Sequence, residues 1–393
     1  MRYCFLGSSA DGGRAFPVVY YSRGWHRRGR CERNDRMKVT VLAAAMLAAA
    51  VYALGAQEAL PSLKKAFDHL FAIGVAVQPS FLDAINPRST LIASQFSAVV
   101  AENCMKPEAL QPSEGTFRFK DADKLALFAR KHGMALRGHT LVWHQQTPLW
   151  FFSDPDQPSK DASRDLLLER MKVHIQTVVA HFRGKVRAWD VVNEALSDSS
   201  GLRTGAEHSK WYEILGPEYI DRAFEYAHEA DPEALLVIND YNLESSPVKR
   251  EAMYDLVHGM LSRGVPVGAI GLQMHVSLYS PSVESVRQAI ERFASLGIKV
   301  QVTELDVSMY SGSEAAKPID DALLRKQADR YGELFSLFKE EAAKGNLDMV
   351  MLWGLSDDQS WLNNFPVAGR TNAPLLFDQE LAPKQAFWTI IHR

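Results

Sequence analysis

Eight short apolar segments alternate with helix-like stretches along most of this chain, and this alternation constrains the fold more than any other feature. The segments are residues 72–77, 97–103, 135–143, 187–194, 235–242, 268–275, 299–307 and 348–356. Short apolar runs of this kind are typical of parallel strands that are buried on both faces. Eight strand–helix units predict a single (β/α)₈ barrel, because such barrels take roughly 250 residues plus insertions.

The stretches between the segments carry helix boundaries that fit this pattern. Val283–Ala294 follows a Ser-Pro-Ser sequence and ends before Gly297, and residues 322–343 end before Gly345. Serine and proline are common at helix starts, and glycine is common just past helix ends. An open, doubly wound sheet is the alternative fold. We favour the closed barrel because no glycine-rich phosphate loop follows the first strand.

Two of the predicted strands end in carboxylates. Residues 189–194 read Trp-Asp-Val-Val-Asn-Glu, and residues 300–306 read Val-Gln-Val-Thr-Glu-Leu-Asp. Glu194 and Glu304 are therefore each expected at the C-terminal end of a strand, and in a parallel barrel these ends form one ring. Two carboxyl groups on one ring, a proton donor and a nucleophile, are what glycosidic bond cleavage requires.

Side-chain alternation along a strand decides which residues can share a site. Three pairs are expected to face the same side: Glu304 with Asp306, Gln273 with His275, and His139 with Trp143. His144 is five positions from His139 and is expected to face away while the strand stays extended, which argues against a metal site formed by these histidines. Asn193 and Glu194 can reach one ligand only if their strand ends there, and the loop-like composition that follows indicates that it does.

We expect the N-terminal region, residues 1–56, to be absent from the mature protein. Residues 37–56 resemble a secretory signal peptide, with Met37-Lys38 before an Ala-rich run that ends at Ala56. This run is shorter than the roughly 20 apolar residues that span a bilayer, so no stable membrane association is expected. Residues 1–36 are Arg-rich and are either a basic arm or untranslated sequence upstream of Met37; we favour the second. The catalytic domain then comprises residues 57–393, and the protein is expected to be secreted or periplasmic.

Charge and cysteine content limit the classes of partner. The net charge is −3, so no basic excess indicates binding to nucleic acid. Cys104 is the one cysteine after residue 57, so the mature fold is not expected to contain an internal disulfide. The chain has 8 Trp, 12 Tyr and 19 Phe, which could stack on sugar rings or fill a core. We expect a monomer.

Several motifs at the predicted strand ends resemble glycoside hydrolase family 10, the endo-β-1,4-xylanases. They are Gly138-His-Thr-Leu-Val-Trp-His144, Trp189-Asp-Val-Val-Asn-Glu194, Gly271-Leu-Gln-Met-His275, Thr303-Glu-Leu-Asp306, Ala101-Glu-Asn-Cys-Met-Lys106, Asn239-Asp-Tyr-Asn242 and Trp353-Gly-Leu-Ser-Asp-Asp-Gln-Ser-Trp361. The resemblance covers residues 82–388. It implies retaining hydrolysis of internal β-1,4 bonds in xylan, with xylan and xylo-oligosaccharides as ligands and without a metal or organic cofactor.

The resemblance also implies roles for the residues that match the family motifs. It implies that Glu194 is the acid/base and Glu304 the nucleophile, and that His275 and Asp306 support the nucleophile. The residues that it places along the sugar subsites are Glu102, Asn103, Lys106, His139, Trp143, Asn193, Gln273, Trp353 and Trp361. Met274 and Cys104 depart from the usual family residues, which affects fine subsite preference rather than the chemistry.

These features together predict a secreted endo-1,4-β-xylanase. A related barrel glycosidase, such as a cellulase or mannanase, is one alternative, but the histidines of residues 139–144 and the Glu102, Asn103 and Lys106 set fit the xylanase family better. A glycan-binding protein without catalysis is another alternative. Nothing in the sequence favours it, because both carboxylates are present.

Overall fold

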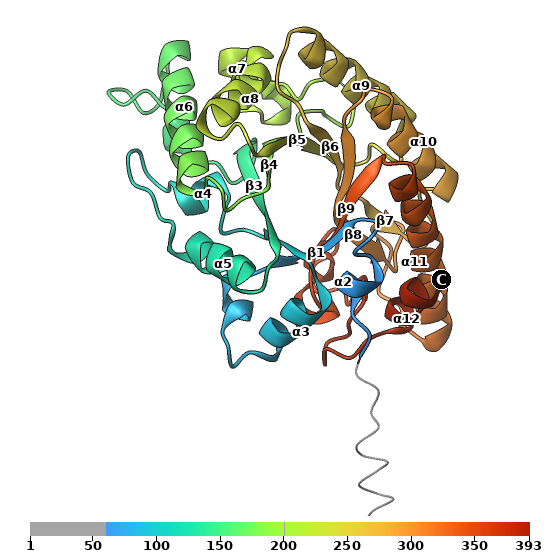
Figure 1. Ribbon diagram of the computed structural model, residues 1–393. Coiled ribbons are helices and arrows are strands. Elements are labelled where there is room, and N and C mark those ends of the chain that lie inside the picture. Colours follow the sequence, from blue (N-terminus) through green and yellow to red (C-terminus); the bar gives the residue numbers. More distant parts are fainter. Residues whose placement is uncertain (1–59, 200) are drawn as a thin grey trace, which may run out of the picture. The chain divides into compact units, whose positions relative to one another are not determined.

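The computed structural model describes residues 60–199 and 201–393 (Figure 1). The predicted basic extension (1–36) and signal peptide (37–56) lie outside the described residues and stay predictions. Among the described residues, no helix combines the length and the apolar character that a membrane crossing requires.

Nine strands pair in parallel within the described part of the chain. They are β1 (Ala72–Val77), β2 (Ala98–Ala101), β3 (Ala135–Trp143), β4 (Ala188–Asn193), β5 (Leu235–Asp240), β6 (Ala269–Leu272), β7 (His275–Ser277), β8 (Lys299–Ser308) and β9 (Leu347–Leu352). Strands β1 to β6 pair in sequence order, β8 pairs with β6 and β9, and β9 pairs with β1. The sheet therefore closes on itself, which confirms the predicted (β/α)₈ barrel.

One predicted strand is interrupted. Residues 268–275 were expected to form a continuous strand, but they form β6 and the start of β7, with Gln273 and Met274 between them. Met274 has a φ of 63°, a left-handed conformation that cannot continue a pleated strand. β7 pairs with the last residues of β8, so the interruption turns the end of this strand position toward β8.

Helices surround the barrel, as Figure 1 shows. They are α2 (Leu63–Ala66), α3 (Pro87–Gln95), α4 (Pro107–Leu110), α5 (Lys120–Lys131), α6 (Arg164–His181), α7 (Lys210–Leu215), α8 (Glu218–Ala230), α9 (Pro247–Ser262), α10 (Val283–Ala294), α11 (Asp321–Ala343) and α12 (Gln385–His392). Helix α10 has the predicted bounds. Its first turn is capped by Ser282, whose hydroxyl accepts a hydrogen bond from the Ser285 amide at 3.1 Å.

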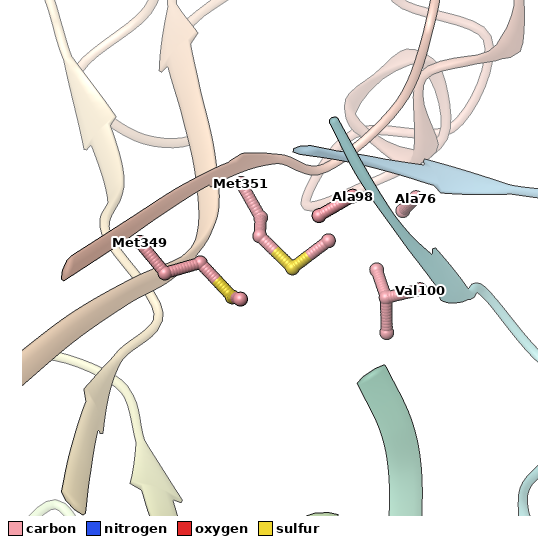
Figure 2. Close-up of a cluster of buried hydrophobic side chains, with 5 residues drawn as sticks. All are labelled: Ala76, Ala98, Val100, Met349 and Met351. Carbon is pink, nitrogen blue, oxygen red and sulfur yellow. The ribbon is translucent and has the colours of Figure 1, made fainter. Parts of the chain in front are cut away.

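Small side chains make room for methionine in one part of the core. Figure 2 shows Ala76, Ala98 and Val100 of β1 and β2 together with Met349 and Met351 of β9. A Cβ atom at Gly74 would lie 2.5 Å from Cε of Met351 and 3.0 Å from Cβ of Ala98, so a side chain there would require these neighbours to shift. Trp353 packs against this cluster, which connects it to the polar ends of the strands.

A buried ion pair lies between β3 and β4. The guanidinium of Arg137 binds both carboxylate oxygens of Asp190, and each residue is 1% exposed. Burial alone would raise the pKa of Asp190, but the charge of Arg137 and the hydrogen bond with His139 lower it overall. Nδ1 of His139 lies 3.0 Å from Oδ2 of Asp190, so the ion pair also orients this histidine.

Candidate active site

A cleft of about 920 Å³ is lined by residues at the C-terminal ends of the strands and by the loops that follow them. Every residue that the sequence placed in the site lines this cleft: Glu102, Asn103, Lys106, His139, Trp143, Asn193, Glu194, Gln273, His275, Glu304, Asp306, Trp353 and Trp361. The barrel thus brings together side chains that are up to 259 positions apart (Glu102 to Trp361, 361 − 102 = 259).

Glu194 lies just past the end of β4, among neutral hydrogen-bond donors. Its φ is 56°, which ends the strand and allows Asn193 and Glu194 to face the same cleft. Oε2 of Glu194 accepts a hydrogen bond from the indole of Trp143 at 3.0 Å. Oε1 accepts from the amides of Gln273 at 3.2 Å and Asn193 at 3.3 Å. The predicted strand end at this position is therefore confirmed.

Glu304 lies within β8 and is held by a charged network. Its Oε2 is 3.3 Å from Nε2 of His275, and Nδ1 of that histidine is 2.9 Å from Oδ2 of Asp306. The indole of Trp361 donates to the same Asp306 oxygen at 2.8 Å. The expected contacts of His275 with Glu304 and Asp306 are thus present, and the Glu304 side chain is only 6% exposed.

The charge states within this network favour an ionised Glu304. Burial acts to lower the pKa of His275, but Asp306 and Glu304 outweigh it and raise that pKa to about 10. His275 is therefore an imidazolium at neutral pH, and both of its N–H groups donate. Burial acts to raise the pKa of Glu304, but the hydrogen bond from His275 and the charges of His139 and His275 lower it overall.

Asn239 links the surroundings of the two carboxyl groups. Its Nδ2 donates to Oε1 of Glu304 at 2.7 Å and to Oδ1 of Asn193 at 2.8 Å. The hydroxyl of Thr303 donates to Oδ1 of Asn239 at 2.7 Å, which fixes the orientation of this amide. Asn239 was not among the predicted site residues. The signal was available, because Asn239 follows an apolar run at the end of β5, as Asn193 does at the end of β4.

Other side chains give the cleft polar and flat apolar surfaces. Lys106 donates to Oδ1 of Asn103 at 2.9 Å and lies 5.0 Å from the ring centre of Trp143. The Trp361 ring lies 4.9 Å from that of His275 and stacks on Phe365 at 5.0 Å. Ammonium and amide groups can hydrogen-bond sugar hydroxyls, and indole faces can pack against sugar rings.

The prediction that His144 faces away from His139 was wrong, because both line the cleft. The pairing of β3 with β4 shifts register between His139 and Val142, and β3 ends at Trp143, so simple alternation does not extend to His144. Nε2 of His144 lies 4.0 Å from Oε2 of Glu194. Burial, followed by the charges of Arg203, His208 and Lys249, lowers the pKa of His144 to about 3, so this histidine is neutral.

The family model of glycosyl hydrolase family 10 matches residues 62–393. The chain belongs to glycosyl hydrolase family 10. This membership confirms the resemblance seen in the strand-end motifs and agrees with the closed barrel.

Relatives in this family differ in their names and in their length. Endo-1,4-beta-xylanase C of Paenibacillus barcinonensis is 49% identical over 351 residues, which cover 87% of this chain and 32% of that protein. Exoglucanase XynX of Acetivibrio thermocellus is 49% identical over 340 residues, which cover 85% of this chain and 30% of that protein. The chain therefore spans less than a third of the length of either relative.

A solved structure gives a comparison in three dimensions. It is a variant of an intracellular xylanase from Thermoanaerobacterium saccharolyticum in complex with xylotetraose. It matches with a TM-score of 0.78 at 49% identity, and the match covers 85% of this chain and 99% of that chain.

The raised pKa of His275 predicts a pH-dependent stability. A folded-state pKa of about 10, above the ordinary 6.5, stabilises the fold fully below about pH 6.5, and this contribution is lost as pH rises toward 10. We expect the difference in Tm between wild type and H275Q to be largest near pH 6 and to shrink by pH 10. Thermal unfolding of both proteins across this range tests it, and a difference in Tm that does not change with pH would contradict it.

Proposed function

We propose that this chain is a retaining endo-1,4-β-xylanase, with Glu194 as the acid/base and Glu304 as the nucleophile. The observation that carries the proposal is that two carboxyl groups share one cleft in different surroundings. Glu304 faces the imidazolium of His275, whereas the Glu194 carboxyl group accepts hydrogen bonds from neutral amide and indole donors. One carboxyl group is thus held ionised as the nucleophile, and the other is assigned the role of proton donor, as retaining hydrolysis requires.

In the first step, the Glu304 carboxylate attacks the anomeric carbon of the sugar. The bond from that carbon to the glycosidic oxygen breaks, and Glu194 gives its proton to the departing oxygen. The His275 imidazolium holds Glu304 in place and keeps it ionised before attack. The neighbouring His144 is neutral, because burial lowers its pKa to about 3.

In the second step, water displaces Glu304 from the anomeric carbon. Esterification has removed the negative charge of Glu304, and Glu194, now ionised, takes a proton from the attacking water. The new bond forms on the face from which the glycosidic oxygen left, so the product keeps the β configuration. Glu304 leaves as a carboxylate, and Glu194 is protonated again.

The amide groups suit a transition state that resembles an oxocarbenium ion. Asn193 lies beside Glu194 and can donate to the sugar 2-hydroxyl, a hydrogen bond that strengthens as positive charge develops. Lys106, Glu102 and Gln273 can bind other ring hydroxyls. The Trp353 and Trp361 rings offer flat faces to the sugar bound at the reaction centre.

The relatives support xylan as the substrate. One relative at 49% identity is named an endo-1,4-beta-xylanase, and the solved structure of another holds xylotetraose. A relative at the same identity is named an exoglucanase, so hydrolysis of β-1,4-glucan is the second candidate activity.

We further propose that the chain is secreted through residues 37–56 and acts as a monomer. The apolar run and the small residues before Gln57 support cleavage at that point. The mass of the N-terminal peptide of the native protein tests this proposal. A mature chain that starts near Gln57 is expected, and one that retains residues 37–56 would contradict it.

Variants of the two carboxyl groups separate their roles. We expect E304A to lower kcat on xylan by on the order of 10⁴-fold or more, because the attacking group is gone. Azide should restore turnover of an activated aryl xylobioside and give the α-glycosyl azide with E304A but the β-glycosyl azide with E194A. NMR of the products identifies the anomers. E251Q, which changes an exposed carboxylate of α9, is the matched control. The opposite pair of anomers would overturn the assignment.

A panel of polysaccharides separates the two candidate activities. We expect kcat/KM on linear xylan to exceed that on carboxymethyl-cellulose and mannan by at least about 100-fold, because a site that rejects one extra substituent can discriminate by this factor. Early NMR spectra of the xylan digest should show the β-anomer first. Equal or greater activity on carboxymethyl-cellulose would favour the glucanase alternative, and tight xylan binding without products would favour a binding protein.

A further inference from the structure

The loop after β4, of which the structure describes residues 194–199 and 201–203, begins with Glu194 and contacts the end of β5. Glu194 has a φ of 56°, a backbone conformation that is unfavourable for a residue with a side chain. The amide of Glu194 donates to the carbonyl of Asn239 at 2.8 Å. This hydrogen bond does not fix the carbonyl of Glu194 or the residues that follow it, so their position depends on other contacts.

Arg203 supplies that support from the far end of the loop. Its Nε donates to the carbonyl of Glu194 at 3.2 Å, and its Nη2 donates to the carbonyl of Leu196 at 3.1 Å. The backbone amide of Arg203 donates to the carbonyl of Ala195 at 2.8 Å. Three consecutive peptide carbonyls therefore accept hydrogen bonds from a single residue.

The other side of the loop is anchored to β5 and α9. Oδ2 of Asp240 accepts a hydrogen bond from the amide of Leu196 at 3.0 Å, and Oδ1 lies 2.9 Å from Nζ of Lys249. Lys249 also lies 3.4 Å from the ring centre of Tyr241, whose hydroxyl accepts from Nη2 of Arg203 at 2.9 Å. Asp240 and Lys249 are at most 1% exposed, so this support is rigid and dry.

We propose that Arg203 is a positioning residue for the acid/base: its guanidinium holds the peptide of Glu194 against Tyr241, so that the Glu194 carboxyl stays aimed at the departing oxygen. The inference rests on the proposed role of Glu194. Arg203 acts through the backbone, and its loss should therefore impair proton donation more than sugar binding or attack by Glu304. Without these hydrogen bonds, the loop backbone would allow the carboxyl more than one orientation.

Leaving groups of different basicity separate proton donation from the other steps. A xylose leaving group needs a proton from the acid, whereas 2,4-dinitrophenolate leaves without one. A general structural defect would lower kcat/KM for both kinds of substrate. A misplaced acid lowers it only where the leaving group needs the proton.

The experiment compares kcat/KM for xylotetraose and for 2,4-dinitrophenyl β-xylobioside in R203Q and R203K. We expect R203Q to lose roughly 10- to 100-fold on xylotetraose, which is part of the roughly 10²- to 10⁴-fold that general acid catalysis contributes, and less than about 3-fold on the aryl substrate. R203K keeps the positive charge but loses the planar set of N–H donors of the guanidinium, so its kcat/KM on xylotetraose should lie between those of wild type and R203Q. R263Q, which breaks an exposed ion pair with Asp221 on α8, is the matched control.

Two further variants keep the outcomes distinct. E194Q should show the same selectivity in a stronger form; if it loses activity equally on both substrates, the proposed role of Glu194 fails. If E194Q is selective but R203Q loses equally on both substrates, or on neither, the positioning role of Arg203 is overturned. Y241F removes only one acceptor of Arg203 and should show a smaller loss with the same selectivity, which keeps the test decisive if R203Q does not fold.

Discussion

A buried carboxylate needs compensating charge, and the site is arranged around this need. Glu304 is almost fully buried in β8, yet its pKa is lowered, because the imidazolium of His275 outweighs the effect of burial. His275 is held in turn by Asp306, which also accepts from the indole of Trp361. Three elements of the chain thus converge on one negative charge. Without the imidazolium, the same burial would favour a neutral acid that could not attack.

The fold itself positions these groups through its irregularities. Strand β4 ends with a positive φ at Glu194, and the break between β6 and β7 has a positive φ at Met274. β8 shifts register against β9 between Val302 and Leu305, and Thr303 and Glu304 both reach Asn239 there. A regular pleat would send such neighbours to opposite faces. Local departures from regular strand geometry therefore concentrate polar side chains on one cleft.

The sequence predicted the barrel and the residues of the cleft because both follow from regular signals. Apolar runs with polar ends identified the strands, and the family motifs at those ends identified the residues that line the cleft. What was missed depends on backbone irregularity or on long-range contacts. His144 was misplaced because a register shift in β3 breaks the alternation. Asn239 had a local signal at the end of its strand that was not used, whereas Arg203 acts through contacts with Glu194 and Tyr241 that strand patterns do not reveal.

The pairing of β1 with β9 has a consequence for the order in which the molecule is made. Residues 72–75 are synthesised well before their partners at 349–352, and Trp353 and Trp361 follow those partners. The edge of β1 that pairs with β9 therefore stays unpaired until residues 349–352 have been synthesised. A chain that stops before residue 347 lacks both the pairing of β1 with β9 that closes the barrel and two of the tryptophans that line the cleft, Trp353 and Trp361. An unpaired strand edge can pair with other growing chains, so this edge needs shielding until β9 has been made.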